Sequence, residues 1–338
     1  MKLRTIAILI LSGSMAVSCF KEDQAVPPYI PPENVETISL QSSLYEYQIY
    51  FDLNTGEIRG ENKNSAWELA FECGVNGWHI RINSSGYWGV AQTGSTNFDS
   101  IFSDKTLYTW AFDKSDGNPD STAIGKWVNF DSGLAVYSNA VYLIGKYNGI
   151  TYEPQKKVQF LHNDDNSYKF IVSGLNENNT DTVQVSKQND FNYVHYSFHE
   201  NRVMILEPDK NDWDILFTQY SSVLYTDEGV PTPYFVRGVL QNPYKTESIL
   251  DTITDFNKIG YSYAEMHNFS IKQDAIGYDW KEVKVDEGSN SAEYKVRKGY
   301  TYIIKDTRSG FYKLRFTSYF NQSGIRGYPS FEFTKLLP

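Results

Sequence analysis

The chain has 338 residues, with 31 basic against 41 acidic side chains and a net charge of −10. This acidic balance, without a basic stripe, excludes nucleic acid as an expected partner. Only two cysteines are present, so the fold must be held together by burial rather than by a disulfide framework. Tyrosine (26 residues) and phenylalanine (20 residues) are abundant, which favours β structure, because aromatic side chains suit half-buried pleated surfaces.

The N-terminal segment has the layout of a secretory signal peptide. Lys2 and Arg4 form a positive start, an unbroken apolar run covers residues 6–11, and small residues at 16–18 precede Cys19. The apolar run is far shorter than the ~20 residues that a membrane-spanning helix needs. We therefore predict that residues 1–18 are removed and that the mature chain does not span a membrane.

The residues around Cys19 resemble a bacterial lipobox, the motif in which the cysteine thiol receives a diacylglycerol. The match departs at Ala16, where leucine is usual, and the alternative is an ordinary cleaved signal with a chance cysteine. Lys21-Glu22-Asp23 is similar to the short charged tag that sends some lipoproteins to the outer face of the outer membrane. The resemblance implies a protein anchored by lipid in the outer membrane and facing outward. Cys73 then has no disulfide partner and is interpreted as a small buried apolar residue.

The segment after Cys19 predicts a spacer. Residues 19–36 contain proline pairs at 27–28 and 31–32, which favour extended polyproline II and cannot join a sheet. Such a segment is semi-rigid, so we expect it to hold the globular part away from the lipid headgroups.

Short alternating runs fill the rest of the chain and predict β-strands. Residues 45–50, 78–82 and 312–316 each place large apolar side chains on one face and polar side chains on the other. Turn signals such as Asn54-Thr55-Gly56 separate these runs. The pattern predicts an all-β protein of short antiparallel strands, with the polar faces towards solvent.

An internal repeat divides the sequence after the tether. Residues 47–71 align without gaps with residues 193–217, at an offset of 146. Two further pairs of short matches occur in the same order, at similar offsets: Ala123-Ile124-Gly125 and Trp127 with Ala275-Ile276-Gly277 and Trp280, and Tyr168-Lys169-Phe170 with Tyr312-Lys313-Leu314. The repeat predicts two tandem antiparallel two-sheet, sandwich-like domains, residues 37–188 and 189–338.

The best-matched part of the repeat is Trp67-Glu68-Leu69-Ala70-Phe71, which aligns with Trp213-Asp214-Ile215-Leu216-Phe217. On a strand, the tryptophan, the first aliphatic residue and the phenylalanine share one face, and the acidic residue points the other way. We interpret the apolar face as core, in preference to a surface that stacks on a ligand.

These motifs resemble the HmuY-like family of secreted haem-binding lipoproteins. The similar segments are Trp67–Phe71 followed by Trp78–Asn83, Glu207-Pro208 leading to residues 211–220, and residues 312–319 with 327–333. The resemblance covers most of residues 38–338, as two copies where the founding members have one. It implies an all-β protein that grips haem or a related porphyrin between loops at one end. Such proteins take haem from host proteins and pass it to an outer-membrane transporter.

The iron ligands of the family are not found at the expected place. The founding members use two histidines, one a few residues after the tryptophan that corresponds to Trp280, but residues 280–285 contain none. Met266 and His267, in a tyrosine-rich segment ahead of Trp280, are the candidate haem ligands. Adjacent residues point in opposite directions on extended backbone, so at most one could serve a given iron. The alternative is a loop with a packed Met266 and an exposed His267.

The other histidines do not suggest a metal site. His195 and His199 share one face of a predicted strand, roughly 13 Å apart, so they cannot approach one iron from opposite sides. Both are predicted to face solvent, and His79 and His162 are predicted surface positions.

The sequence contains no signature of an enzyme. It lacks a G-x-S-x-G elbow, an H-E-x-x-H pair and a P-loop, so we predict a binding protein. The alternative to haem is a duplicated scaffold that binds a glycan or a protein partner through tyrosine and tryptophan side chains.

Overall fold

The structure is a computed structural model that describes residues 34–338, except 75, 101, 103–106, 176–178, 226, 228, 230 and 287–290. The predicted signal peptide, Cys19 and nearly all of the predicted tether lie outside the described residues. Residues 34–338 belong to one compact unit. Within the described part of the chain, no helix is long and apolar enough to cross a membrane.

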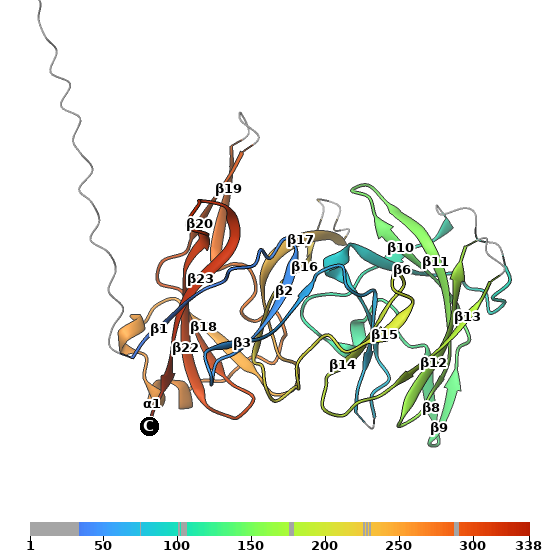
Figure 1. The fold of residues 1–338 in the computed structure, drawn as a ribbon, viewed down its shortest axis with the longest axis horizontal. Coiled ribbons are helices and arrows are strands. Elements are labelled where there is room, and N and C mark those ends of the chain that lie inside the picture. Colours follow the sequence, from blue (N-terminus) through green and yellow to red (C-terminus); the bar gives the residue numbers. More distant parts are fainter. Residues whose placement is uncertain are drawn as a thin grey trace, which may run out of the picture. The chain divides into compact units, whose positions relative to one another are not determined.

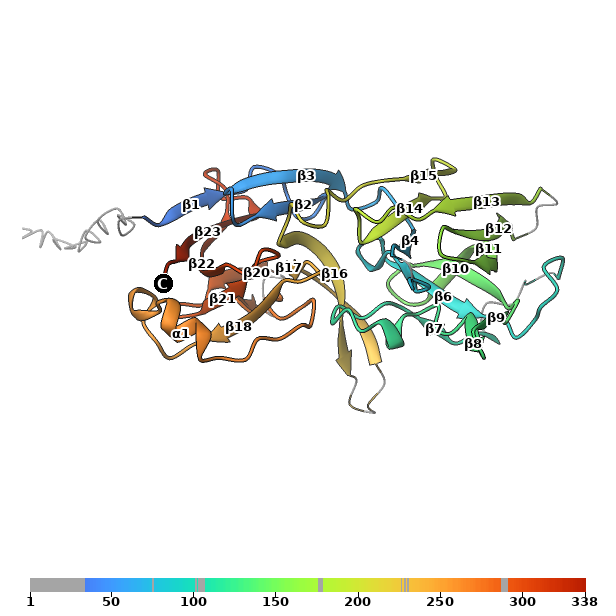
Figure 2. The same cartoon turned by 90° about the horizontal axis from the view of Figure 1, so that it is seen from below.

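Among the described residues, antiparallel strands make up almost all of the regular secondary structure, as predicted (Figures 1 and 2). One sheet has the order β1-β23-β22-β21-β18, with bounds Glu36–Ser39, Arg326–Leu336, Phe311–Phe320, Thr301–Lys305 and Glu247–Asp251. A second has the order β13-β12-β11-β10-β6-β7, with bounds Asp181–Ser186, Ser167–Gly174, Tyr152–Asn163, Val141–Tyr147, Trp88–Gln92 and Trp110–Ala111.

Two four-stranded sheets and two hairpins complete the described strands. The four-stranded sheets are β17-β16-β2-β3 (Pro231–Gln241, Ile215–Tyr225, Tyr47–Asp52, Glu57–Lys63) and β15-β14-β4-β5 (Arg202–Met204, Tyr193–Ser197, Leu69–Glu72, Ile80–Ile82). The hairpins are β8–β9 (Val128–Asp131, Leu134–Tyr137) and β19–β20 (Lys281–Asp286, Ser291–Val296). A short helix α1, Tyr261–Glu265, follows β18.

Each four-stranded sheet packs one face against a larger sheet, which confirms the sandwich-like arrangement. In one hydrophobic cluster Phe71 of β4 stacks on Phe170 of β12, with ring centroids 5.3 Å apart. In the other, Phe51 of β2 and Phe217 of β16 both meet Phe331 of β23, at 5.2 and 5.1 Å. Burial of these aromatic rings contributes to the apolar area that holds each pair of sheets together.

The two sequence repeats exchange strands. The offset of 146 relates β2 to β14 and β4 to β16, yet β2 pairs with β16 and β14 pairs with β4. Each of these four strands therefore pairs with a strand from the other repeat. The hydrophobic cluster around Phe217 contains buried apolar residues from two segments. The segment 40–53 of the first repeat contributes Leu40, Leu44, Ile49, Phe51 and Leu53, and the others come from the segment 215–333. The predicted boundary near residue 188 separates the two repeats in the sequence. In the structure, each of the two hydrophobic clusters contains residues from both sides of that boundary.

Equivalent asparagines hold equivalent turns in the two repeats. Each buried side-chain amide donates to two backbone carbonyls, and the acceptors are again 146 residues apart. The contacts are from Asn83 Nδ2 to the carbonyls of Asn64 (2.8 Å) and Trp67 (2.7 Å), and from Asn242 Nδ2 to those of Lys210 (2.9 Å) and Trp213 (2.7 Å). These contacts support the predicted duplication, although the two asparagines are 159 positions apart and escape a gapless alignment.

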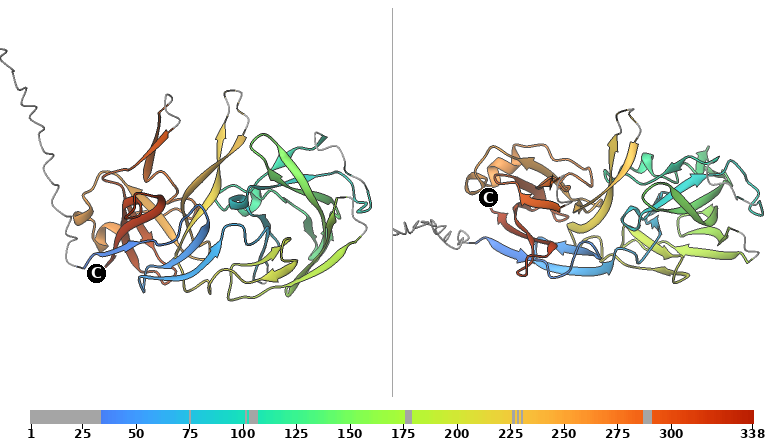
Figure 3. Two further views of the ribbon diagram at one scale, coloured as in Figure 1. Left: turned by 45° about the horizontal axis from the view of Figure 1, so that its top comes forward. Right: turned by 90° about the horizontal axis from the view of Figure 1, so that it is seen from above.

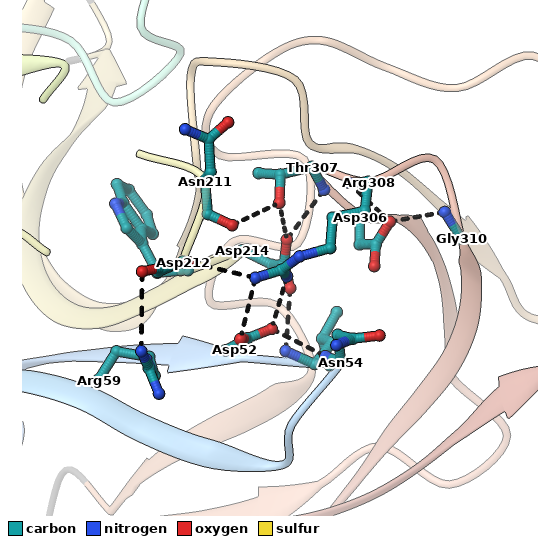
Figure 4. Close-up of polar contacts among 12 residues, drawn as sticks. Asp52, Asn54, Arg59, Asn211, Asp212, Asp214, Asp306, Thr307, Arg308 and Gly310 are labelled. Carbon is teal, nitrogen blue, oxygen red and sulfur yellow. Dashed lines mark hydrogen bonds and ion pairs between the residues drawn. The ribbon is translucent and has the colours of Figure 1, made fainter. Parts of the chain in front are cut away.

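The acidic residue of the repeated motif is buried and forms hydrogen bonds to distant segments of the chain, as Asp214 of the second repeat shows (Figure 4). Asp214 is fully buried, and its Oδ2 accepts a hydrogen bond from the backbone N–H of Leu53 at 2.9 Å. Its Oδ1 accepts from the N–H of Thr307 at 2.9 Å. In the first repeat Glu68 accepts from the N–H of Phe198 at 2.6 Å. Asp214 therefore ties three distant segments together rather than facing solvent.

An arginine joins the same cluster from the turn after β21. Arg308 grips both carboxylate oxygens of Asp52, at 3.0 and 3.4 Å, and also reaches Asp212 at 3.4 Å (Figure 4). Arg59 contacts the other oxygen of Asp212 at 3.7 Å. Burial raises the pKa of the neighbouring Asp214 to about 6, with smaller contributions from the charges of Asp306 and Asp52. The carboxylates of Asp52, Asp212 and Asp214 therefore take part in hydrogen bonds and ion pairs that stabilise the fold.

Two histidines predicted at the surface are not exposed: His195 is buried and His79 is half-buried. His195 in β14 is 4% exposed and meets the edge of the Trp67 ring at 4.9 Å. His79 has a side chain that is 14% exposed, and its Nδ1 lies 2.5 Å from Glu72 Oε2. The prediction was wrong because an alternating strand shows that its two faces differ, but not what covers the polar face. His162 and His199 are exposed, as predicted.

The tryptophans of the repeated motif also differ from the prediction. Leu69 and Phe71 lie in a hydrophobic cluster, but β4 begins only at Leu69, so Trp67 precedes the strand and is outside that cluster. Trp213 likewise precedes β16 and packs edge-on against Tyr50, with ring centroids 5.0 Å apart. Both tryptophans line a cavity between the two four-stranded sheets.

Candidate functional site

Two hairpins project from the second repeat and enclose a hollow between them. The β16–β17 hairpin runs from the pair Ile215–Gln241 to the pair Tyr225–Pro231, and the β19–β20 hairpin follows directly after the buried Trp280. Figure 3 shows both hairpins standing out from the body. The hollow has a volume of about 310 Å³, which is at the lower end of the range of small-molecule sites.

Aromatic side chains form much of the wall of the hollow. They are Tyr234 and Phe235 of β17, Tyr278 of the loop before β19, Tyr294 of β20 and Tyr319 of β22. The rings of Tyr234 and Tyr278 lie 6.3 Å apart, with an edge-to-face tilt of 61°. Burial, followed by contact with Tyr45, raises the pKa of Tyr294 and of Tyr319, so both phenols stay protonated near neutral pH. Such walls suit a flat apolar ring system.

Two arginines add cationic groups to the hollow. The guanidinium of Arg237 lies over the ring of Tyr45, 4.0 Å from its centroid. Arg297 approaches Glu282 at 3.9 Å. The Nε atoms of both arginines are buried and have no hydrogen-bond partner among the described residues. Guanidinium groups bind carboxylates with two parallel hydrogen bonds, so the hollow offers donors to an anionic ligand.

Lys281 is the first residue of β19 and lines the hollow. Its ammonium donates to the carbonyl oxygens of Arg237 and Tyr278, the latter at 3.3 Å. It lies 4.2 Å from the ring centroid of Trp280. Burial lowers the pKa of Lys281 to about 7, so the charge of the hollow changes near neutral pH.

Two glycines bring the loop that carries Tyr278 onto β17. The N–H of Val239 donates to the carbonyl of Gly277 at 2.9 Å, and the N–H of Gly277 returns to Val239 at 3.0 Å. Gly277 has φ +67°, which favours glycine. A Cβ atom on Gly238 would lie 2.5 Å from the carbonyl oxygen of Gly277, so only glycine permits this approach.

Met266 and His267, the ligands suggested by the sequence, lie elsewhere. Met266 caps the C-terminal end of α1 and is 77% exposed. His267 is exposed, and its Nδ1 is 2.7 Å from the carbonyl oxygen of Tyr263, on whose ring it stacks at 4.3 Å. That contact makes Nδ1 the donor and leaves Nε2 as an acceptor. Neither residue lines the hollow.

Among the described residues that line the hollow there is no histidine, cysteine or methionine. Within the described part of the chain, no group of three or more His, Cys, Asp or Glu side chains could hold a metal ion. The sequence indicated this region only through Trp280, because the family's ligand follows that tryptophan. The sequence did not indicate Arg237 or Tyr234. Both lie on β17, a strand that the alignment of the two repeats does not predict.

Comparison with known proteins identifies a family. The model of the family described as HmuY protein matches residues 44–333, which spans both predicted copies. No curated protein sequence matches the chain.

Several solved structures can be superposed on the chain, all at low identity. Apo PinO from Porphyromonas gingivitis has 10% identity and a TM-score of 0.26, over 90% of this chain and 97% of that one. The apo HmuY analog of Tannerella forsythia has 9% identity and a TM-score of 0.24, over 90% and 96%. A HmuY-like heme binding protein from Bacteroides vulgatus has 16% identity and a TM-score of 0.20, over 54% and 93%. The family assignment rests on the family model.

Proposed function

Because the chain belongs to the HmuY protein family, we propose that it captures haem or a related porphyrin in the hollow between the β16–β17 and β19–β20 hairpins. The observation that carries the proposal is the combination of aromatic walls with the guanidinium groups of Arg237 and Arg297, which line the same hollow. A porphyrin is a flat apolar plate with two carboxylates, and each of these parts finds a complement in the hollow.

Iron coordination in the hollow would come from oxygen. Tyrosine is one of the protein ligands that haem iron accepts, and Tyr234 and Tyr278 both line the hollow, with their ring centroids 6.3 Å apart. The pair suggested by the sequence is a second proposal. His267 keeps Nε2 free to accept, with Nδ1 bound to a carbonyl as is usual for a metal-binding histidine. Met266 beside it is exposed.

The wider role follows from the proposed anchor. We propose that lipid on Cys19 holds the protein at the outer membrane, facing outward, and that residues 20–36 act as the tether. Bound porphyrin would be taken from a host protein and passed to an outer-membrane transporter. The proposed function is the binding of a ligand in the hollow, without a catalytic step.

A glycan or protein ligand is the alternative, and one observation favours it. The other side of β17 borders an open hollow of about 460 Å³, where Phe235 meets Tyr87 at 3.8 Å and Tyr147 at 6.2 Å. Half-buried aromatic rings of this kind suit sugar rings or an apolar side chain of a partner.

A visible-absorption titration of haem into residues 20–338 tests the proposal. We expect a saturable shift of the Soret band, and an affinity about tenfold weaker in Arg237→Leu, because a carboxylate loses its guanidinium partner. Arg202→Leu is the control, since Arg202 is an exposed arginine of β15 that pairs only weakly with Glu200, at 3.7 Å. Melting temperatures show whether each variant is folded.

The same titration separates the two proposed ligand sites. Binding in the hollow leaves Met266→Ala and His267→Ala at the affinity of the unaltered protein. A loss of the Soret shift in either variant, with Arg237→Leu unaffected, would move the site to the end of α1. A flat, unsaturable response in the unaltered protein would reject haem capture and favour the glycan or protein ligand.

A further inference from the structure

Lys281 carries a buried amine in the hollow between the two hairpins, and the proposed function gives this amine no role. The residue is 6% exposed and lines the hollow. Its Nζ lies 4.9 Å from the ring centroid of Tyr319 and donates to the carbonyl oxygens of Arg237 and Tyr278. These three residues line the hollow as well, so the amine lies among the side chains and carbonyls that form its wall.

Burial provides Lys281 with a neutral amine at physiological pH. An ammonium loses its hydration when it is buried, which lowers the pKa of Lys281 to about 7. The charge of Asp279 opposes this shift, and the charge of Arg237 adds to it. Near pH 7 roughly half of the Lys281 side chains are therefore neutral, against fewer than roughly one in a thousand for an ordinary lysine. A neutral lysine amine is a nucleophile, because its lone pair is not protonated.

The hydrogen bonds of Lys281 leave the lone pair of the neutral amine unused. An ammonium has three donors, so the neutral amine keeps two, and the two carbonyl acceptors match them. Lys313 is also buried, and its Nζ likewise donates to two carbonyl oxygens, those of Phe256 at 2.7 Å and Ile259 at 2.9 Å. Lys313 is not among the described residues that line the hollow. Lys281 therefore differs from Lys313 in having space for a ligand beside it.

The shape and charge of the hollow define which electrophile fits beside the amine. Its aromatic walls suit a flat ring. A cavity of roughly 150 Å³ holds benzene in another protein, so a hollow of about 310 Å³ has room for roughly two fused rings. The charged residues of the lining are Arg237, Arg297, Asp279 and Glu282, and Arg297 lies 3.9 Å from Glu282. With the amine neutral these charges cancel, so the hollow selects a ring rather than a charge on that ring.

We propose that Lys281 captures a flat aromatic aldehyde in the hollow as an imine. The lone pair of Nζ attacks the carbonyl carbon, and a C–N double bond forms. The carbonyl oxygen leaves as water with the two hydrogens of the amine, so the step needs no oxidant, reductant or further reactant, and water reverses it. Tyr234 and Val283 line the hollow and are exposed, so an aldehyde can enter from solvent. The capture uses the hollow of the proposed porphyrin site but does not depend on porphyrin binding.

Borohydride trapping of residues 20–338 with naphthaldehyde at pH 7 tests the proposal. Reduction converts an imine into a stable secondary amine, which peptide mass mapping assigns to one lysine. We expect at least about tenfold more adduct on Lys281 than on Lys284, an exposed lysine of the same strand, because an exposed amine stays protonated. Lys313 should carry no adduct. The mapping is done on the unaltered protein, so the result does not depend on a variant that folds.

Equal adduct on Lys281 and Lys284, or no adduct on Lys281, would overturn the proposal. Hexanal tests the requirement for a ring. The ratio of adduct on Lys281 to adduct on Lys284 cancels the intrinsic reactivity of each aldehyde, and it should be roughly fivefold lower for hexanal, which cannot stack on the aromatic walls. An unchanged ratio would overturn the aromatic class.

A parallel haem titration separates this proposal from porphyrin capture. A Soret shift without adduct on Lys281 would reject only the aldehyde proposal. Adduct on Lys281 without a Soret shift would support the aldehyde proposal and reject porphyrin capture.

Discussion

Glu207 is a buried carboxyl whose protonation couples folding to pH. It is 6% exposed, and its Oε1 accepts the backbone N–H of Tyr193 at 2.7 Å. Burial raises its pKa from 4.5 to about 8 in the folded protein. The folded state therefore keeps a proton that the unfolded state releases, so this contribution to stability is complete below pH 4.5 and is lost as the pH rises towards 8.

We predict that Glu207→Gln removes this dependence on pH. Between pH 5 and 8 the unaltered protein should lose on the order of 3 kcal/mol of unfolding free energy from this group, whereas the amide variant should lose much less. Denaturant unfolding at several pH values measures the difference. Glu61→Gln, at the exposed counterpart in the first repeat, is the control and should follow the unaltered protein. Equal slopes for Glu207→Gln and the unaltered protein would contradict the assignment.

At the scale of residues, the sequence predicted which apolar side chains lie in a core better than it predicted what covers the polar side chains. The motif Trp67–Phe71 correctly placed Leu69 and Phe71 in a core. It could not show that the other face of the strand is covered by a second sheet. For the same reason His195 was predicted in solvent and lies at 4% exposure.

At the scale of elements, the β16–β17 hairpin depends on the close approach of Gly238 to Gly277. We predict that Gly238→Ala destabilises the protein by about 1–3 kcal/mol, because its Cβ would lie 2.5 Å from a backbone oxygen that must then shift. The shift displaces Tyr278, so haem affinity should fall as well. Gly260→Ala is the control, since a Cβ there meets nothing within 4 Å. Denaturant unfolding checks the first effect and absorption titration the second; equal stability of the two variants would contradict this account.

The existence of strands was predictable, but their partners were not. Residues 312–316 lie in β22 and most of residues 45–50 lie in β2, as the alternation predicted, whereas β5 begins only at Ile80. Alternation is a local property of the chain. Pairing of β2 with β16 depends on contacts more than 150 residues apart, for which a single sequence carries no signal.

At the scale of the whole molecule, the repeat and the fold describe different divisions of the chain. The repeat predicted two tandem domains, and the hydrogen bonds of Asn83 and Asn242 support the duplication. Strand exchange nevertheless assigns residues 40–53 to the cluster of the second repeat. The two repeats also differ where the proposed site lies: β19–β20 borders the hollow, and its counterpart β8–β9 does not.

The location of the porphyrin site can be measured by hydrogen–deuterium exchange of residues 20–338 with and without haem. Binding in the hollow should slow exchange in residues 231–241 and 281–296, the strands that line it. Residues 128–137, in the counterpart hairpin of the first repeat, should be unchanged and provide an internal control. Slower exchange confined to residues 261–269, or no change anywhere at saturating haem, would contradict the proposed site.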